Sequence, residues 1–188
     1  MTRVGTALAA AVALLSVSAC TGEEPAGGDP TTSAPSPRAT PSPTPTPAAP
    51  TIPPEATEHS ADGAAAFVKY FYSLINYAAV TGDTSRLESA SGNDCRACER
   101  LVKRYAALYA EGGHSEDPQW TPTITSSQLA KGDFYVTADV RTGSYLYKPD
   151  AGSPATRMKA GEYHDLFRLD WTGSGWVTDL FMEQETPQ

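Results

Sequence analysis

The sequence has few of the residues that build metal sites, nucleic-acid sites and membrane spans. It contains three cysteines and three histidines in 188 residues, with no second Cys pair or His-x-His cluster to complete a four-ligand zinc site. Lys and Arg total 14 against 22 Asp and Glu, and this acidic balance gives no advantage in binding phosphates. The apolar run at residues 4–17 is shorter than the roughly 20 residues that a membrane-spanning helix needs. We therefore expect no metal, no other cofactor and no nucleic-acid partner.

What is present begins with a targeting signal. One basic residue, Arg3, precedes the apolar run, and small residues then lead into Cys20. This order is typical of a secretory signal peptide. A cysteine at this place resembles the lipobox of bacterial lipoproteins. The resemblance implies cleavage of the signal peptide (1–19), a diacylglycerol on Cys20, and a membrane anchor at the extracytoplasmic face of the cell membrane.

The chain that follows Cys20 has the composition of a tether. Residues 21–54 are mostly Pro, Thr, Ser, Ala and Gly, with almost no large apolar side chain, so they cannot bury enough surface to fold. The alternating prolines of residues 41–47 favour extended polyproline II. We expect a disordered Pro/Thr/Ser-rich tether over residues 20–56, with O-glycosylation as a hypothesis, and a single globular domain over residues 57–186.

Helical periodicity dominates the first half of that domain. Ser60 and Gly82 bound a segment whose apolar residues recur every three or four positions, which predicts a helix over about 60–80. Ser85 and Glu88 match a capping box and predict a second, short helix. A third helix is expected to begin at Asn93 or Asp94 and to run to about residue 110.

After Trp120 the period changes from 3.6 to 2. Alternation predicts strands at 123–129, 134–147 and 157–171, the second bent at Gly143, and a hairpin then leads to a strand at 176–182. Three helices followed by about four antiparallel strands make an α+β fold. The order and lengths of these elements resemble the NTF2-like (cystatin-like cone) superfamily, which implies a strongly curved sheet wrapped around the first helix.

A narrower resemblance rests on the lipobox, the Thr/Pro stalk, the helix segment 67–72, the segment 81–85 and the pair Cys95-x-x-Cys98. Together they are similar to an actinobacterial family of secreted lipoproteins of unknown function. That resemblance supports the anchored location and implies no activity.

Cys95 and Cys98 are the two cysteines left once Cys20 is lipidated, and an oxidising compartment favours a disulfide between them. A structural staple between the second and third helices is the interpretation we favour. The alternative is a thiol-disulfide oxidoreductase, because a helix N-terminus and Arg96 would lower the pKa of Cys95. No βαβ pattern precedes the pair, which argues against that alternative.

Two sets of side chains are candidates for binding. Strand alternation places Asp165 on the interior face and His164 on the exterior, so Asp165 is expected in a pocket of the cone, as a hydrogen-bonded wall or a general base. The candidate pocket residues are Tyr70, Tyr135, Tyr163, Asp165 and Trp171. The second set is a basic stripe on the third helix, formed by Arg96, Arg100, Lys103 and Arg104. No catalytic residue is assigned.

The expected function is a non-catalytic binding or accessory module, held at the membrane through the lipid on Cys20, that contacts an envelope protein or a small ligand. The alternative is a cavity enzyme of the dehydratase, isomerase or hydrolase type. An open pocket that holds Asp165 and facing tyrosines would favour a ligand or a substrate. A cone filled by its own rings would favour a partner-binding surface.

Overall fold

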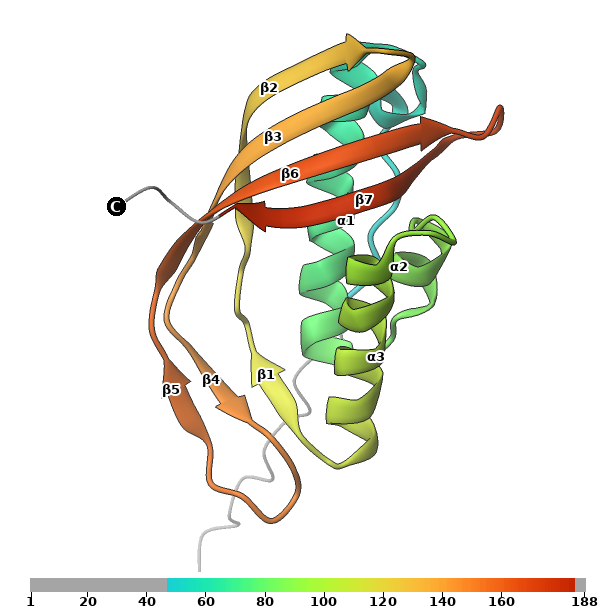
Figure 1. Ribbon diagram of the computed structural model, residues 1–188. Coiled ribbons are helices and arrows are strands. Elements are labelled where there is room, and N and C mark those ends of the chain that lie inside the picture. The colour runs from blue at the N-terminus through green and yellow to red at the C-terminus, as the bar shows by residue number, and fades with distance from the viewer. Residues whose placement is uncertain (1–46, 185–188) are drawn as a thin grey trace, which may run out of the picture. The chain divides into compact units, whose positions relative to one another are not determined.

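The computed structural model describes residues 47–184, so the expected signal peptide, Cys20 and most of the expected tether lie outside the described residues. Within that range the chain forms a short 3-10 helix η1 (Pro54–Thr57), three α-helices and seven β-strands (Figure 1). The helices are α1 (Ala61–Thr81), α2 (Ser85–Ser89) and α3 (Arg96–Ala110). The strands are β1 (His114–Glu116), β2 (Thr121–Ala130), β3 (Asp133–Thr142), β4 (Tyr145–Lys148), β5 (Thr156–Met158), β6 (Gly161–Trp171) and β7 (Trp176–Gln184). None of the helices in this range is long and apolar enough to cross a membrane.

The limits of α1 agree with the expected helix. The Ser60 hydroxyl accepts a hydrogen bond from the Gly63 amide at 3.0 Å, which caps the first turn. Gly82 ends the helix with a left-handed backbone (φ 75°), a conformation that glycine adopts without steric cost. The apolar face between these residues is buried in the core.

The expected caps of α2 and α3 were wrong. The N-cap of α2 is Thr84, without a side-chain hydrogen bond, because Asp83 accepts from both the Ser85 hydroxyl and the Ser85 amide. The N-cap of α3 is Cys95, whose sulfur accepts from the Cys98 amide at 3.3 Å.

The strands form two antiparallel sheets, one of four strands in the order β2-β3-β6-β7 and one of three in the order β1-β4-β5. Two long ribbons run through both sheets, since β3 leads into β4 across Gly143 and β5 leads into β6 across residues 159–160. The expected single sheet of about four strands is therefore corrected to seven strands in two sheets. The ribbons bend sharply enough to break the hydrogen-bond ladders (Figure 1).

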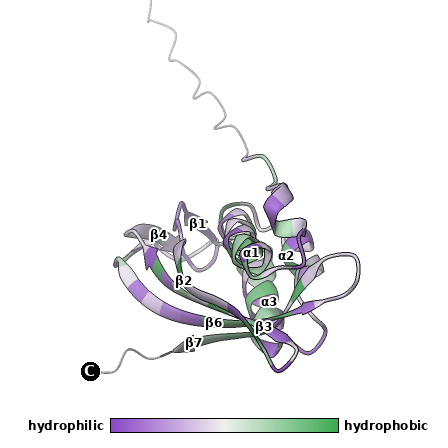
Figure 2. Ribbon diagram, turned by 90° about the horizontal axis from the view of Figure 1, so that it is seen from above, coloured by the Kyte–Doolittle hydropathy of each residue, from purple (hydrophilic) through white to green (hydrophobic). Residues whose placement is uncertain are grey.

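The helices pack on one side of the four-stranded sheet (Figure 2). Phe71 of α1 contacts Phe167 of β6 edge-on at 5.8 Å, and Phe167 stacks on Phe181 of β7 at 4.9 Å between ring centroids. Phe71 and Phe167 are buried in the core between α1 and the four-stranded sheet, and the partly buried Phe181 packs against it.

The domain begins earlier than the expected residue 57. Ala56 is fully buried, and the Arg86 guanidinium donates to the Pro50 carbonyl at 2.7 Å. His59, which stands just before α1, stacks on Trp171 with ring centroids 4.9 Å apart. Residues from about 50 onward therefore pack against the domain.

Candidate functional site

A cavity of about 290 Å³ lies where the sheet bends away from α1 and α3. Its lining is mostly aromatic and apolar, with four tyrosines, one tryptophan and four other apolar side chains. One carboxylate and one guanidinium complete it. The lining residues are Tyr72, Ile75, Leu101, Arg104, Tyr105, Trp120, Tyr145, Met158, Tyr163, Asp165 and Phe181. They come from both sheets and from two helices, so the bend itself creates the cavity.

Asp165 lies at the buried end of the cavity. Its side chain belongs to the core face of β6 and the residue is only 5% exposed. The Tyr72 hydroxyl of α1 donates a short hydrogen bond to Asp165 Oδ2. A buried carboxylate is costly without such a donor, so this contact makes the carboxylate tolerable and fixes its orientation. The neighbouring His164 lies on the opposite face, as alternation predicts, with Nδ1 2.5 Å from Asp139 Oδ1.

Tyrosine rings form the wall of the cavity. Tyr105 of α3 packs edge-on against Trp120 at 6.5 Å, and Trp120 contacts Tyr145 of β4 at 5.9 Å. Burial raises the pKa of Tyr105 and of Tyr145, an effect that the nearby Arg104 guanidinium opposes in both. The two phenols are therefore neutral at physiological pH and offer hydroxyl groups on an otherwise apolar wall.

Arg104 and Met158 define the open end. Arg104 is exposed on α3, and Met158 of β5 is 37% exposed. The cavity thus has an exposed positive group at its mouth and a buried carboxylate at its base.

The five expected pocket residues separate into two groups. Tyr163 and Asp165 both line the cavity. Tyr70, Tyr135 and Trp171 do not: Tyr135 lies opposite Arg168 across the strand pair, and Trp171 stacks on His59. Tyr135 alternates with the core residues Phe134 and Val136 and so faces away from the cavity.

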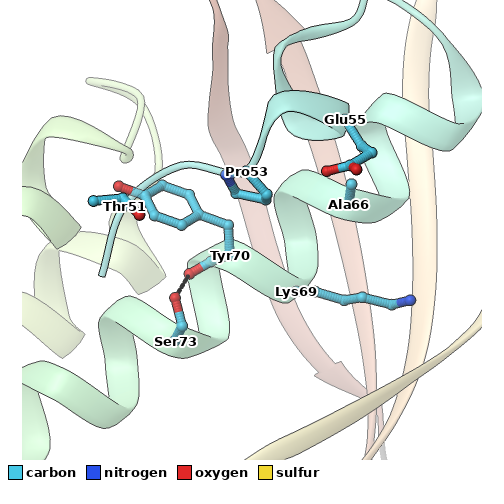
Figure 3. Close-up of a pocket in the computed structure, with 7 residues that line it drawn as sticks. All are labelled: Thr51, Pro53, Glu55, Ala66, Lys69, Tyr70 and Ser73. Carbon is cyan, nitrogen blue, oxygen red and sulfur yellow. Dashed lines mark hydrogen bonds between the residues drawn. The ribbon is translucent and has the colours of Figure 1, made fainter. Parts of the chain in front are cut away.

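Tyr70 lines a different depression, on the outer side of α1 (Figure 3). Its ring lies beside Thr51 and Pro53, and the Ser73 hydroxyl donates to the Tyr70 carbonyl at 2.6 Å. Two positions along a helix differ by about 200°, so Tyr72 faces the cavity and Tyr70 does not. The opposite orientation of the two tyrosines could have been inferred from the sequence, because Tyr72 is two positions from Tyr70 in a predicted helix. Trp120 carried no such signal, since it lies before the first strand of the four-stranded sheet and lines the cavity only because of the bend.

The expected basic stripe divides into two parts. Lys103 is ion-paired with Glu99, and this contact lowers the pKa of the Glu99 carboxyl. Arg100 and Arg104 instead line a groove of about 710 Å³ between α3 and β7, together with Ala97, Leu101, Phe181 and Met182. Leu101, Arg104 and Phe181 line both the groove and the cavity, so the two are continuous. Arg96 is exposed on the first turn of α3 and lines neither.

Cys95 and Cys98 form a disulfide, with their Cα atoms 5.2 Å apart. Both residues are buried, at 2% and 0% exposure, and neither lines the cavity. The bond holds the loop between α2 and α3, where the Gly92 amide donates to the Thr178 carbonyl at 2.8 Å. Across residues 47–184, no group of three or more Cys, His, Asp and Glu side chains is placed to hold a metal ion.

Fold and site together define an α+β domain of three helices and two antiparallel sheets, in which two of the helices and strands of both sheets enclose a tyrosine-lined cavity. The chain belongs to DUF6318, a family of unknown function whose model matches residues 38–180. No curated protein matches it. Its fold is similar to that of the intermembrane space region of the chloroplast protein ARC6, with a TM-score of 0.58 and 15% sequence identity, over 69% of this chain and 99% of that one.

Proposed function

We propose that this protein is a non-catalytic binding module whose cavity takes a small ligand with an apolar ring or body and a polar group at each end. The arrangement of Asp165 at the buried base and Arg104 at the exposed mouth, with tyrosines between them, carries the proposal. An apolar wall with a few oriented polar groups is the usual chemistry of a small-molecule site.

The polar groups at the two ends define the ligand. A guanidinium at the mouth pairs with a carboxylate or phosphate group. The Asp165 carboxylate and the tyrosine hydroxyls at the inner end suit a hydrogen-bond donor, such as a hydroxyl or an amine. The rings between these ends favour an aromatic or aliphatic body of modest size.

The proposal includes the location and the superfamily of the domain. Lipid on Cys20 would anchor the chain at the extracytoplasmic face of the membrane, and the Pro/Thr-rich tether would carry the domain away from the bilayer. The sheet that bends around α1, and the cavity inside that bend, are features expected of an NTF2-like cone in an actinobacterial lipoprotein.

Binding is favoured over catalysis by the surroundings of Asp165. The carboxylate already accepts a hydrogen bond from Tyr72, and the other ionisable groups of the lining are tyrosines and one arginine. His164 faces away and contacts Asp139. The alternative, a dehydratase, isomerase or hydrolase, would use Asp165 as the general base in this same cavity. Thiol-disulfide exchange is disfavoured because both sulfur-bearing residues are buried.

The test is a ligand-observed NMR screen of aromatic fragments against the full chain, with and without a carboxylate on each fragment. We expect carboxylate-bearing fragments to bind, and Arg104→Ala to weaken them about tenfold, because the variant removes the charged partner at the mouth. Lys103→Ala is the matched control: it removes a neighbouring positive charge that does not line the cavity. Equal binding to both variants, or no fragment bound, would overturn the proposal. Conversion of a bound fragment that is lost in Asp165→Asn would favour the enzyme.

A further inference from the structure

The groove between α3 and β7 runs along an edge of the four-stranded sheet. Phe181 and Met182 are adjacent in β7, so their side chains point to opposite faces of the sheet. A groove lined by both residues must follow the edge of the strand. Phe181 packs into the core against Phe167, whereas Met182 is 46% exposed.

This edge is open over half of its length. In the four-stranded sheet β7 has a single neighbour, β6 (Figure 1). On the other side, the Ala90 carbonyl and the Gly92 amide form hydrogen bonds with Thr178. From Leu180 to Gln184, no backbone hydrogen bond to any other described segment covers that side. An edge strand in this state presents backbone donors and acceptors to an incoming chain.

The opposite wall of the groove is positively charged. Arg100 and Arg104 are one helical turn apart on α3, both are exposed, and neither is ion-paired with a side chain that the structure describes. The chain as a whole carries a formal net charge of −8, so this wall is a local region of positive charge on an acidic protein. An acidic ligand would be attracted to it specifically.

We propose that this groove binds an extended, acidic segment of a partner protein, which adds a strand to the open edge of β7. Backbone hydrogen bonds along Leu180–Gln184 would provide the pairing. Acidic side chains on the segment would face Arg100 and Arg104 on α3, and the apolar side chains between them would lie on the opposite face of the sheet, beside Met182. The inference goes beyond the ligand cavity, which it adjoins at Arg104.

Other occupants fit the groove less well. A second copy of this chain carries the same net charge of −8, so two copies repel each other. A bilayer surface is flat and cannot follow a groove between a helix and a strand edge. A single anionic lipid could reach the arginines, but it has no backbone with which to pair the edge.

The test selects random dodecapeptides displayed on phage against the full chain. We expect the enriched sequences to carry Asp or Glu at alternate positions with β-branched or aromatic residues between them, because alternation places one set of side chains toward α3. The most enriched peptide, labelled with a fluorophore, is then measured by anisotropy against variants. Arg100→Glu should weaken its binding at least tenfold, and Lys103→Glu, the same charge change away from the groove, less than twofold. Raising the salt concentration should weaken binding further.

A second measurement tests the pairing itself. Bound peptide should slow hydrogen exchange of the backbone amides in residues 180–184 that point to the open side, every second one along the strand, because the added ladder hydrogen bonds protect them. Selection of no peptide, of basic peptides, or of peptides that leave these amides unprotected would overturn the proposal. The proposal would also be overturned if no peptide binds and the groove instead binds phosphatidylglycerol vesicles in a way that Arg100→Glu abolishes. A concentration-dependent dimer that Arg100→Glu abolishes, again without peptide binding, would overturn it as well. Arg100 lines the groove and not the cavity, so its replacement leaves the cavity proposal untouched.

Discussion

At the base of the cavity, one hydrogen bond links the longest helix to the centre of the sheet. Tyr72 belongs to α1 and Asp165 to β6, and both residues are almost completely buried. The hydroxyl donates to one oxygen of the carboxylate and holds the group in position toward the cavity. This contact therefore contributes to the stability of the fold as well as to the shape of the site.

Replacing this donor should destabilise the protein. Tyr72→Phe keeps the ring, which packs on Phe167, and removes the hydroxyl that serves the buried carboxylate. We expect the free energy of unfolding to fall by about 2 kcal/mol, since hydrogen bonds to charged groups contribute about 1.5–3 kcal/mol. Urea denaturation measures the change. The control is Tyr70→Phe, two positions along α1 and outside the cavity, and an equal loss in both variants would contradict the prediction.

The sequence allowed a correct inward placement of Asp165, because alternation along a strand is a local property. It did not identify the full wall of the cavity. Tyr105 was not among the expected pocket residues, and Trp120 only marked the start of the strands. Trp120 contacts both Tyr105 and Tyr145, and this cluster depends on contacts between distant segments, which leave no local pattern.

At the scale of the elements, the start of α1 has the closest backbone approach to any glycine that the structure describes. Ser60 caps the helix, and Gly63 in its first turn lies directly against the backbone of residue 58. A Cβ at Gly63 would lie 2.0 Å from the Glu58 carbonyl oxygen. Only glycine allows this approach, which brings the segment before α1 onto the domain.

Helix propensity and packing make opposite predictions for Gly63→Ala. Propensity alone predicts a gain of about 1 kcal/mol, because alanine is the better helix former. We expect a loss of about 2–3 kcal/mol instead, since the clash is with backbone and cannot be relieved by a side-chain rotation. Thermal unfolding decides between the two signs. Gly143→Ala is the control, because its Cβ would have nothing within 4 Å and no positive φ is involved.

Helix limits could be predicted from the sequence where a single residue decides them. Ser60 and Gly82 are such residues, and the structure has both at the ends of α1. The capping box at Ser85 was wrong because Asp83, two residues earlier, accepts the hydrogen bonds of Ser85. The cap of α3 was missed because Cys95 is a poor cap by composition, and it holds that position through the disulfide.

At the scale of the whole molecule, the proposed anchor determines where the cavity and the groove operate. The proposed lipidation site Cys20, the proposed tether and the domain follow one another along the chain, and packing of the domain begins at about residue 50. A freely diffusing domain would need neither the lipid nor the tether. Anchoring would confine the encounter of the groove with its partner to the envelope and raise their effective concentration.

Replacing Cys20, the residue proposed to carry the lipid, tests the anchor. Cys20→Ser should abolish lipid attachment and shift the protein from the membrane fraction to the soluble or secreted fraction, as seen by immunoblotting of fractionated cells. The double variant Cys95→Ser/Cys98→Ser is the matched control: it removes the other two cysteines and should remain in the membrane fraction. A membrane-bound Cys20→Ser variant, or an intact mass without lipid in the parent protein, would contradict the anchor.

The order of helices and strands could be predicted from the change in hydrophobic period near Trp120. The division into two sheets could not. Gly143 indicated one bend, but the break in the second ribbon at residues 159–160 has no glycine or proline within it. That break follows from pairing with a neighbouring ribbon that bends at the same level, a non-local cause.

The loop of residues 90–92 has a further consequence for the proposed complex. It occupies the edge of β7 at Thr178 through a short parallel bridge, and the disulfide at Cys95 holds the chain just beyond it. An added strand that advances along the edge has to stop there, and among the described residues it can pair with the five from Leu180 to Gln184, about 17 Å of extended chain. The loop would therefore set the point along β7 beyond which a partner cannot pair.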